Sequence, residues 1–144
     1  MNLSEYIQYA EKDLIIDETE LDHESLKTPQ LHAKYLDFLV HEKFKLEKVT
    51  INFKSYKKRK WMYYTGKLSL EELDELNWEP FELKILKTDL DKFLDADDEL
   101  QELHLKVKYQ QSVVSYLEEI IKIINNRQWN IRSAIDWLKF TNGQ

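Results

Sequence analysis

The chain has 144 residues, of which 42% are hydrophobic and 33% are charged, and its formal net charge is −6. This length fits one domain, or one small domain with an extended arm. The absence of cysteine excludes disulfides, thiolate zinc sites and cysteine nucleophiles. With only two glycines and two prolines, the chain is expected to form long helices rather than hairpins or glycine-rich phosphate loops.

The N-terminal residues are acidic and lack the apolar segment of a signal peptide. No stretch approaches the 18 or so apolar residues that span a membrane. We therefore expect a cytoplasmic protein without a membrane partner.

Short elements are predicted at the start of the chain. Asn2 or Ser4 can cap a first short helix, and the apolar residues 14–16 suggest an extended or buried link after it. Residues 17–27 begin with capping residues and are consistent with a second short helix.

A long central helix is predicted next. Thr28 can cap it and Pro29 suits its first position, where the missing N–H costs nothing. Neither glycine nor proline follows until Gly66, which is expected to stop the helix after Thr65. A narrow coiled-coil-like seam runs along it, formed by Leu39, Leu46, Val49, Phe53, Tyr56 and Tyr63.

The segment after Gly66 is predicted to be a connector. Residues 67–86 contain a short acidic helix capped by Ser69 and a break at Pro80. Thr88 or Asp89 can cap a further segment, which leads to the next helical region.

The C-terminal part is predicted to be helical and to join subunits. An acidic patch at residues 95–99 suits a helix start, and this helix is expected to break at residues 125–128 before a last helix over 129–140. These helices can pack within the subunit or across subunits; we favour subunit contacts, because the long central helix has few partners of matching length. The predicted oligomerisation residues are Val113, Val114, Leu117, Ile120, Ile121, Ile124, Ile131, Ile135 and Leu138.

Basic residues are concentrated in one stretch of an otherwise acidic chain. Residues 43–67 hold nine Lys or Arg and one acid, whereas each flank has a net charge of −7. Such a block attracts a polyanion, because local potential steers association. Aromatic residues interleave with the lysines, which suits single-stranded nucleic acid: ammonium groups follow phosphates and rings stack on unpaired bases.

Within this stretch, Lys54, Lys57, Lys58 and Trp61 fall within about a 100° arc of the helix, away from the seam. Trp61 either stacks on a base or is buried against the connector. Lys60 falls on the seam, so it either snorkels outward or marks where the seam opens onto a ligand. The predicted nucleic-acid-binding residues are Lys54, Lys57, Lys58, Arg59, Lys60, Trp61, Tyr64 and Lys67.

Metal and catalytic sites have no positive signal. Residues 95–99 alternate acids like a calcium loop, but Leu100 stands where a glycine is needed. The four histidines, at positions 23, 32, 41 and 104, lack metal-ligand spacing. We expect no cofactor and no enzymatic activity.

The chain resembles the UvsY recombination mediators of tailed phages. The resemblance covers most of the chain, through the segments KDLIIDETEL, KKRKWMYYTGK, DADDEL and NNRQWNIRSAIDWLKF. Lys58 and Lys60 stand where that family carries a basic pair tied to single-stranded DNA binding. One departure is Gln128, which follows Arg127 where the family usually places glycine.

The resemblance implies a ring-shaped homo-oligomer, a hexamer or heptamer, assembled by C-terminal helices. It further implies a protein that binds single-stranded DNA, displaces single-strand-binding protein and loads a RecA-like recombinase in the host cytoplasm during infection. We therefore predict an all-α protein with a DNA-binding region at residues 1–87 and an oligomerisation region at 88–144. The alternative is a helical scaffold whose basic stretch docks an acidic protein.

Overall fold

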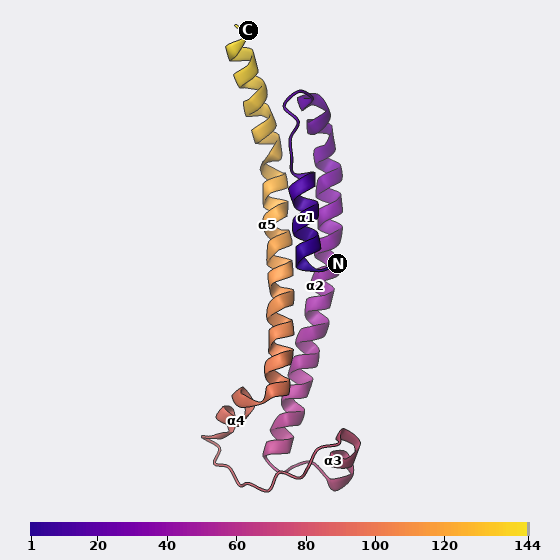
Figure 1. The fold of residues 1–144 in the computed structure, drawn as a ribbon, viewed down its shortest axis with the longest axis vertical. Helices are drawn as coiled ribbons and strands as arrows, with labels where there is room; N and C mark the ends of the chain where they lie inside the picture. The colour runs from indigo at the N-terminus through magenta and orange to yellow at the C-terminus, as the bar shows by residue number, and fades with distance from the viewer. Residues whose placement is uncertain (144) are drawn as a thin grey trace. The chain divides into compact units, whose positions relative to one another are not determined.

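The computed structural model describes residues 1–143, which form helices and no strand (Figure 1). The predicted all-α class with a long central helix is confirmed. None of the described helices combines the length and apolar content that crossing a membrane requires. In chain order the helices are α1 (Leu3–Asp13), α2 (Leu21–Tyr64), α3 (Leu70–Leu76), α4 (Leu90–Ala96) and α5 (Asp98–Thr141).

The chain folds into two compact units, and both long helices contribute to each of them. Unit 1 combines residues 1–45 with the chain from residue 110 onward, and unit 2 comprises residues 46–109. The boundary between these units therefore does not coincide with the predicted division after residue 87.

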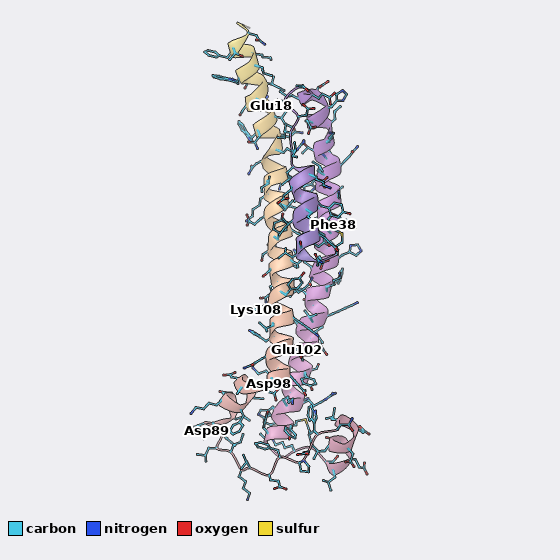
Figure 2. The ribbon with its side chains drawn as sticks, viewed as in Figure 1. Glu18, Phe38, Asp89, Asp98, Glu102 and Lys108 are labelled. Carbon is cyan, nitrogen blue, oxygen red and sulfur yellow. The ribbon has the colours of Figure 1, made fainter. Side chains whose placement is uncertain are left out.

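Unit 1 packs α1 beside the first part of α2 and the second part of α5 (Figure 1). The α1 residue Tyr6 donates its hydroxyl to Glu42 Oε1 at 2.8 Å and meets the ring of Phe38, labelled in Figure 2, at 5.1 Å. Gln110 of α5 donates to the carbonyl oxygen of Glu42 at 3.0 Å. Glu42 thus ties all three helices together around a core that includes the fully buried Tyr35.

Local capping signals produce the predicted helix ends. Asn2 and Glu5 form a capping box at the start of α1. Gly66 adopts a left-handed φ of 71° after α2, and the hydrogen bonds Lys67 N–H to Met62 O and Gly66 N–H to Tyr63 O form a Schellman motif. These ends are set by chemistry within a few residues, which is why the sequence predicts them.

Residues 17–27 do not form the separate helix that the sequence suggested. Asp17 Oδ1 instead accepts hydrogen bonds from the backbone N–H and the hydroxyl of Thr19, at 2.9 and 2.6 Å. This turn leads into α2, which begins at Leu21.

The predicted helix start at Thr28 is wrong, because Pro29 lies inside α2. Proline has no N–H, so the carbonyl oxygen of Ser25, four residues earlier, loses its helical donor. Gln128 of α5 donates to that oxygen at 3.2 Å, and Ser25 Oγ donates to Gln128 Oε1 at 3.0 Å. A side chain from α5 thus offsets the hydrogen bond that Pro29 removes.

The predicted break at residues 125–128 is also wrong, since α5 is continuous there. Arg127 is buried against α2, where it donates to Thr28 Oγ1 at 3.0 Å and pairs with Glu24 through both the carbonyl oxygen and the carboxylate. Hydrogen bonding to Lys27 and Arg127 holds the pKa of Glu24 below its usual range. The polar residues that suggested a break are therefore the groups that bind α5 to α2.

Candidate nucleic-acid interface

The part of α2 that lies in unit 2 carries an exposed set of cations. Lys54, Lys57, Lys58 and Arg59 are all exposed, and no ion pair within residues 1–143 involves any of them. Lys54, Lys57 and Lys58 share one helix face, because residues three and four apart lie together. We call these four side chains the basic face. Its cations are exposed, and their role in binding nucleic acid stays a prediction.

Trp61 extends the basic face towards the end of α2. Trp61 is 36% exposed, and the Lys67 ammonium lies 4.1 Å from its ring centroid. Gly66 reverses the chain between these two residues and so permits this cation–π contact. Because Lys67 covers one face of the ring, a stacking base must use the opposite face or displace Lys67.

Lys60, which lies on the seam and was predicted to bind nucleic acid, does not join the exposed basic face. It is only 7% exposed, and its Nζ lies 3.1 Å from Asp97 Oδ2 and 3.4 Å from Glu99 Oε2. The same ammonium lies 4.2 Å from the ring centroid of Trp78. These contacts neutralise and cover the charge, so Lys60 is not placed to bind a phosphate.

Tyr64 is half-buried and is held by contacts within unit 2. Its hydroxyl donates to Asp97 Oδ2 at 2.6 Å, and its ring packs edge-on against Phe81 with centroids 5.0 Å apart. Phe93 contacts the same ring at 5.8 Å. Burial and the hydrogen bond to Asp97 raise the pKa of Tyr64. These contacts engage the hydroxyl and the ring of Tyr64 within unit 2, and its predicted role in nucleic-acid binding stays a prediction.

Asp97 is the buried carboxylate that organises this region. It caps α5, which begins at Asp98 (Figure 2), because its Oδ1 accepts from the N–H of Leu100 at 3.0 Å. Burial acts to raise the pKa of Asp97, but hydrogen bonds from Tyr64, Leu100 N–H and Lys60 outweigh it and hold that pKa below its usual range. We call Lys60, Asp97, Tyr64 and Trp78 the Lys60 cluster.

The acidic and aromatic partners of Lys60 were not predicted from the sequence. The available signal was the position of Lys60 on the apolar seam between Tyr56 and Tyr63. A cation in a seam requires a counter-charge when it is buried. Asp97 lies 37 positions further along the chain, so no local pattern identifies it as that counter-charge.

A groove lies between the basic face and α3. Its volume is about 490 Å³, and its lining includes Lys58 and Arg59 from α2 and Glu72 and Glu75 from α3. No ion pair within the described chain joins these cations to these acids. The acids therefore lower the positive potential near Lys58 without occupying its ammonium group.

Most of the predicted oligomerisation residues lie in the core of unit 1. Ile121 and Ile135 are half-buried and Leu138 is 44% exposed. The long central helix does have an intrachain partner of matching length, because α5 continues through residues 125–128. The expectation that these side chains face another subunit is wrong for the six that are buried within the chain: Val113, Val114, Leu117, Ile120, Ile124 and Ile131.

No group of three or more metal-ligating side chains occurs within residues 1–143.

A comparison with curated protein sequences finds no match.

Solved structures with the same fold include crystal structures of the bacteriophage T4 recombination mediator protein UvsY. Its lattice type II crystal structure is 20% identical, with a TM-score of 0.85 over 99% of this chain and 98% of that chain. Its lattice type IV structure is 20% identical, with a TM-score of 0.86 over 97% and 99% of the two chains. At this identity the matches show that the two proteins share a fold.

The family comparison covers nearly the whole chain. Residues 9–144 match the family described as "Recombination, repair and ssDNA binding protein UvsY". The match includes the basic face and the Lys60 cluster as well as both long helices. The chain therefore belongs to the UvsY family.

Proposed function

We propose that this protein binds single-stranded DNA through the basic face of α2. The observation that carries the proposal is the exposure of four cations without ion pairs in a member of a family described by single-stranded DNA binding. Ammonium and guanidinium groups bind phosphates irrespective of base sequence, and Trp61 adds an aromatic ring beside them. The acidic flanks disfavour the strand elsewhere on the surface.

We further propose that the protein acts as a recombination mediator that loads a RecA-like recombinase in place of single-strand-binding protein. This role requires DNA binding and protein contacts but no bond-making step, so the proposal includes no catalytic residue. The name of the T4 protein with the same fold supports it. The proposed place of action is the cytoplasm of the infected host cell.

Assembly into a homo-oligomer, a hexamer or heptamer, completes the proposal. One subunit offers about four phosphate contacts, and copies held together convert later contacts into intramolecular ones. Avidity can then supply affinity that a single basic face lacks. Exposed apolar residues near the end of α5 are available for such contacts, including Trp129, Trp137 and Phe140.

The proposal is tested by titrating a fluorescent oligonucleotide with the protein and measuring anisotropy at several salt concentrations. We expect the variant Lys54→Ala/Lys57→Ala/Lys58→Ala to bind weakly and to show a salt slope lower by about 2, at about 0.7 per lost phosphate contact. The control Lys106→Ala removes an exposed charge from α5 and should leave both quantities unchanged.

An unchanged salt slope in the triple variant would contradict the assignment of the basic face. Weak binding to DNA combined with tight binding to an acidic protein would instead favour the scaffold alternative. Salt weakens both interactions, so the affinities for the two ligands must be compared directly.

A further inference from the structure

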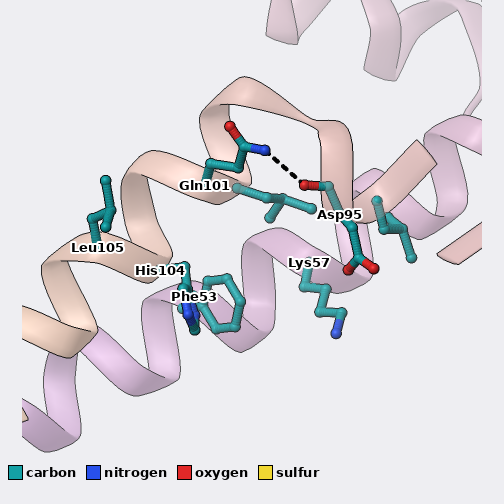
Figure 3. Close-up of a pocket in the computed structure, with 8 residues that line it drawn as sticks. Phe53, Lys57, Asp95, Gln101, His104 and Leu105 are labelled. Carbon is teal, nitrogen blue, oxygen red and sulfur yellow. Dashed lines mark hydrogen bonds between the residues drawn. The ribbon is translucent and has the colours of Figure 1, made fainter. Parts of the chain in front are cut away.

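A cavity opens beside the basic face, within unit 2. Its volume is about 500 Å³, and α2, α4 and α5 all contribute to its lining. Figure 3 shows Phe53 of α2 next to His104 of α5, and Lys57 and Asp95 also line the cavity. Pockets of roughly 300–1,000 Å³ are the size that binds small organic groups.

The walls of the cavity suit a flat, partly apolar ligand. The rings of Phe53 and His104 have centroids 5.7 Å apart and are tilted by 50°. Phe53 is half-buried and His104 is exposed, so one ring is fixed by packing while the other borders solvent. Leu94 and Leu100, both buried, supply aliphatic surface to the same cavity.

Polar groups at the rim match the edges of a nucleotide. Lys57 belongs both to the cavity and to the basic face, and no ion pair within the described residues engages it. Gln101 donates its Nε2 to the carbonyl oxygen of Asp95 at 2.8 Å, which fixes both residues at the rim (Figure 3). The Asp95 carboxylate accepts hydrogen bonds, as a base amino group requires.

We infer that this cavity is a subsite for one unpaired base of the strand that the basic face binds. Phe53 and His104 contact the base, Lys57 contacts the adjacent phosphate, and Asp95 and Gln101 border the base edge. The inference rests on the proposed DNA-binding function and adds a base-binding site to it. The cavity shares the cation Lys57 with the basic face, which an apolar protein side chain would not require. The charge of Lys57 complements a phosphate group, and this favours a nucleotide as the occupant.

The test compares two labelled oligonucleotides of equal length, one natural and one with abasic residues throughout, in the same anisotropy assay. We expect Phe53→Leu and His104→Ala each to weaken binding of the natural strand about fivefold, or about 1 kcal/mol, as loss of a stacked base predicts. Binding of the abasic strand should change less than twofold, and the salt slope should stay the same because no phosphate contact is removed.

The control Ile51→Ala removes an exposed apolar side chain of α2 outside the cavity and should not distinguish the two strands. Thermal unfolding of each variant checks that the fold persists; His104→Ala, at an exposed position, provides a second reading if Phe53→Leu unfolds. Equal losses on both strands, or no loss on either, would overturn the base subsite and leave phosphate binding intact. Failure of the parent protein to bind either strand would reject the function and the subsite together.

Discussion

Lys60 is buried within unit 2, and this changes how its substitution should be interpreted. Its ammonium meets Asp97 at 3.1 Å and Trp78 at 4.2 Å inside the Lys60 cluster. Removing one member of a buried ion pair leaves the other charge uncompensated. Lys58, two positions earlier, is exposed and has no ion pair among the described residues. Neighbouring basic residues therefore have different physical roles.

We predict that Lys60→Met lowers the free energy of unfolding by about 3 kcal/mol, because Asp97 loses its buried counter-charge. Lys58→Met should change it by less than about 0.5 kcal/mol, as is usual at exposed sites. Denaturant unfolding followed by circular dichroism measures both. The double variant Lys60→Met/Asp97→Asn should recover part of the loss, since neither charge remains and Asn still caps α5. Equal destabilisation by Lys58→Met and Lys60→Met would contradict the assignment.

The same cluster predicts a pH dependence of stability. The pKa of Asp97 is lower in the folded protein than its usual value, so its contribution is fully present above the unfolded-state pKa of about 3.9. This contribution is lost as the pH falls through the lower folded pKa. Asp97→Asn should therefore flatten the decrease in stability below about pH 4.

At the scale of elements, α3 places acidic side chains opposite the basic face. Glu72 and Glu75 line the groove that also contains Lys58 and Arg59. At physiological salt, charges interact appreciably only within the screening length of about 8 Å, so the acids nearest to Lys58 and Arg59 have the largest effect on them. The acids of α3 that line the groove should therefore weaken DNA binding more than those on its other faces.

We predict that Glu72→Gln/Glu75→Gln increases affinity for single-stranded DNA about threefold at low salt, because the positive potential at Lys58 is no longer reduced. The matched control Glu71→Gln/Asp74→Asn makes the same charge change on the same helix but outside the groove. Anisotropy titrations at low and high salt measure the difference. Equal gains from the two pairs would show that only net charge matters.

Helix ends fixed by neighbouring residues could be predicted from the sequence, whereas features fixed by residues far apart in the chain could not. The caps at Asn2 and Ser69 and the stop at Gly66 depend on neighbouring residues, and the sequence predicts them. The continuity of α2 past Pro29 and of α5 past Arg127 depends on contacts between residues about a hundred positions apart. Such contacts leave no local pattern, so the apparent start and break were misinterpreted.

For the candidate site, periodicity predicts which residues share a face but not what covers it. Lys54, Lys57 and Lys58 share an exposed face as the helical spacing indicates. The burial of Lys60 depends on Trp78, which lies in the connector after α2, and on Asp97, which follows α4. The base subsite was missed for the same reason, because its lining comes from three helices.

At the scale of the whole molecule, the apolar residues of α5 divide between the core and the surface. Leu117 and Ile124 are completely buried, whereas Trp137 and Phe140 are 64% and 75% exposed. The two exposed rings stack on each other with centroids 5.9 Å apart. Any self-association of the native chain must use such uncovered side chains and not those already packed in unit 1.

We predict that Trp137→Ala/Phe140→Ala lowers the mass measured by light scattering without changing the stability of the subunit, because the removed rings are exposed. Leu117→Ala, by contrast, should change the stability of the subunit itself. It should lower the free energy of unfolding by about 3 kcal/mol, because it leaves a cavity in the core. An unchanged mass for the first variant would place the subunit contacts elsewhere.

The discontinuity of unit 1 has a consequence for how the protein is made. Its first stretch ends at residue 45 and its second begins at residue 110, so the ribosome completes unit 2 in between. At roughly 5–20 residues per second, the second stretch begins only roughly 3–13 seconds after the first has been made, so the helix faces of the first stretch stay uncovered for at least that time. During that interval, chaperone binding or premature association of nascent chains competes with correct folding.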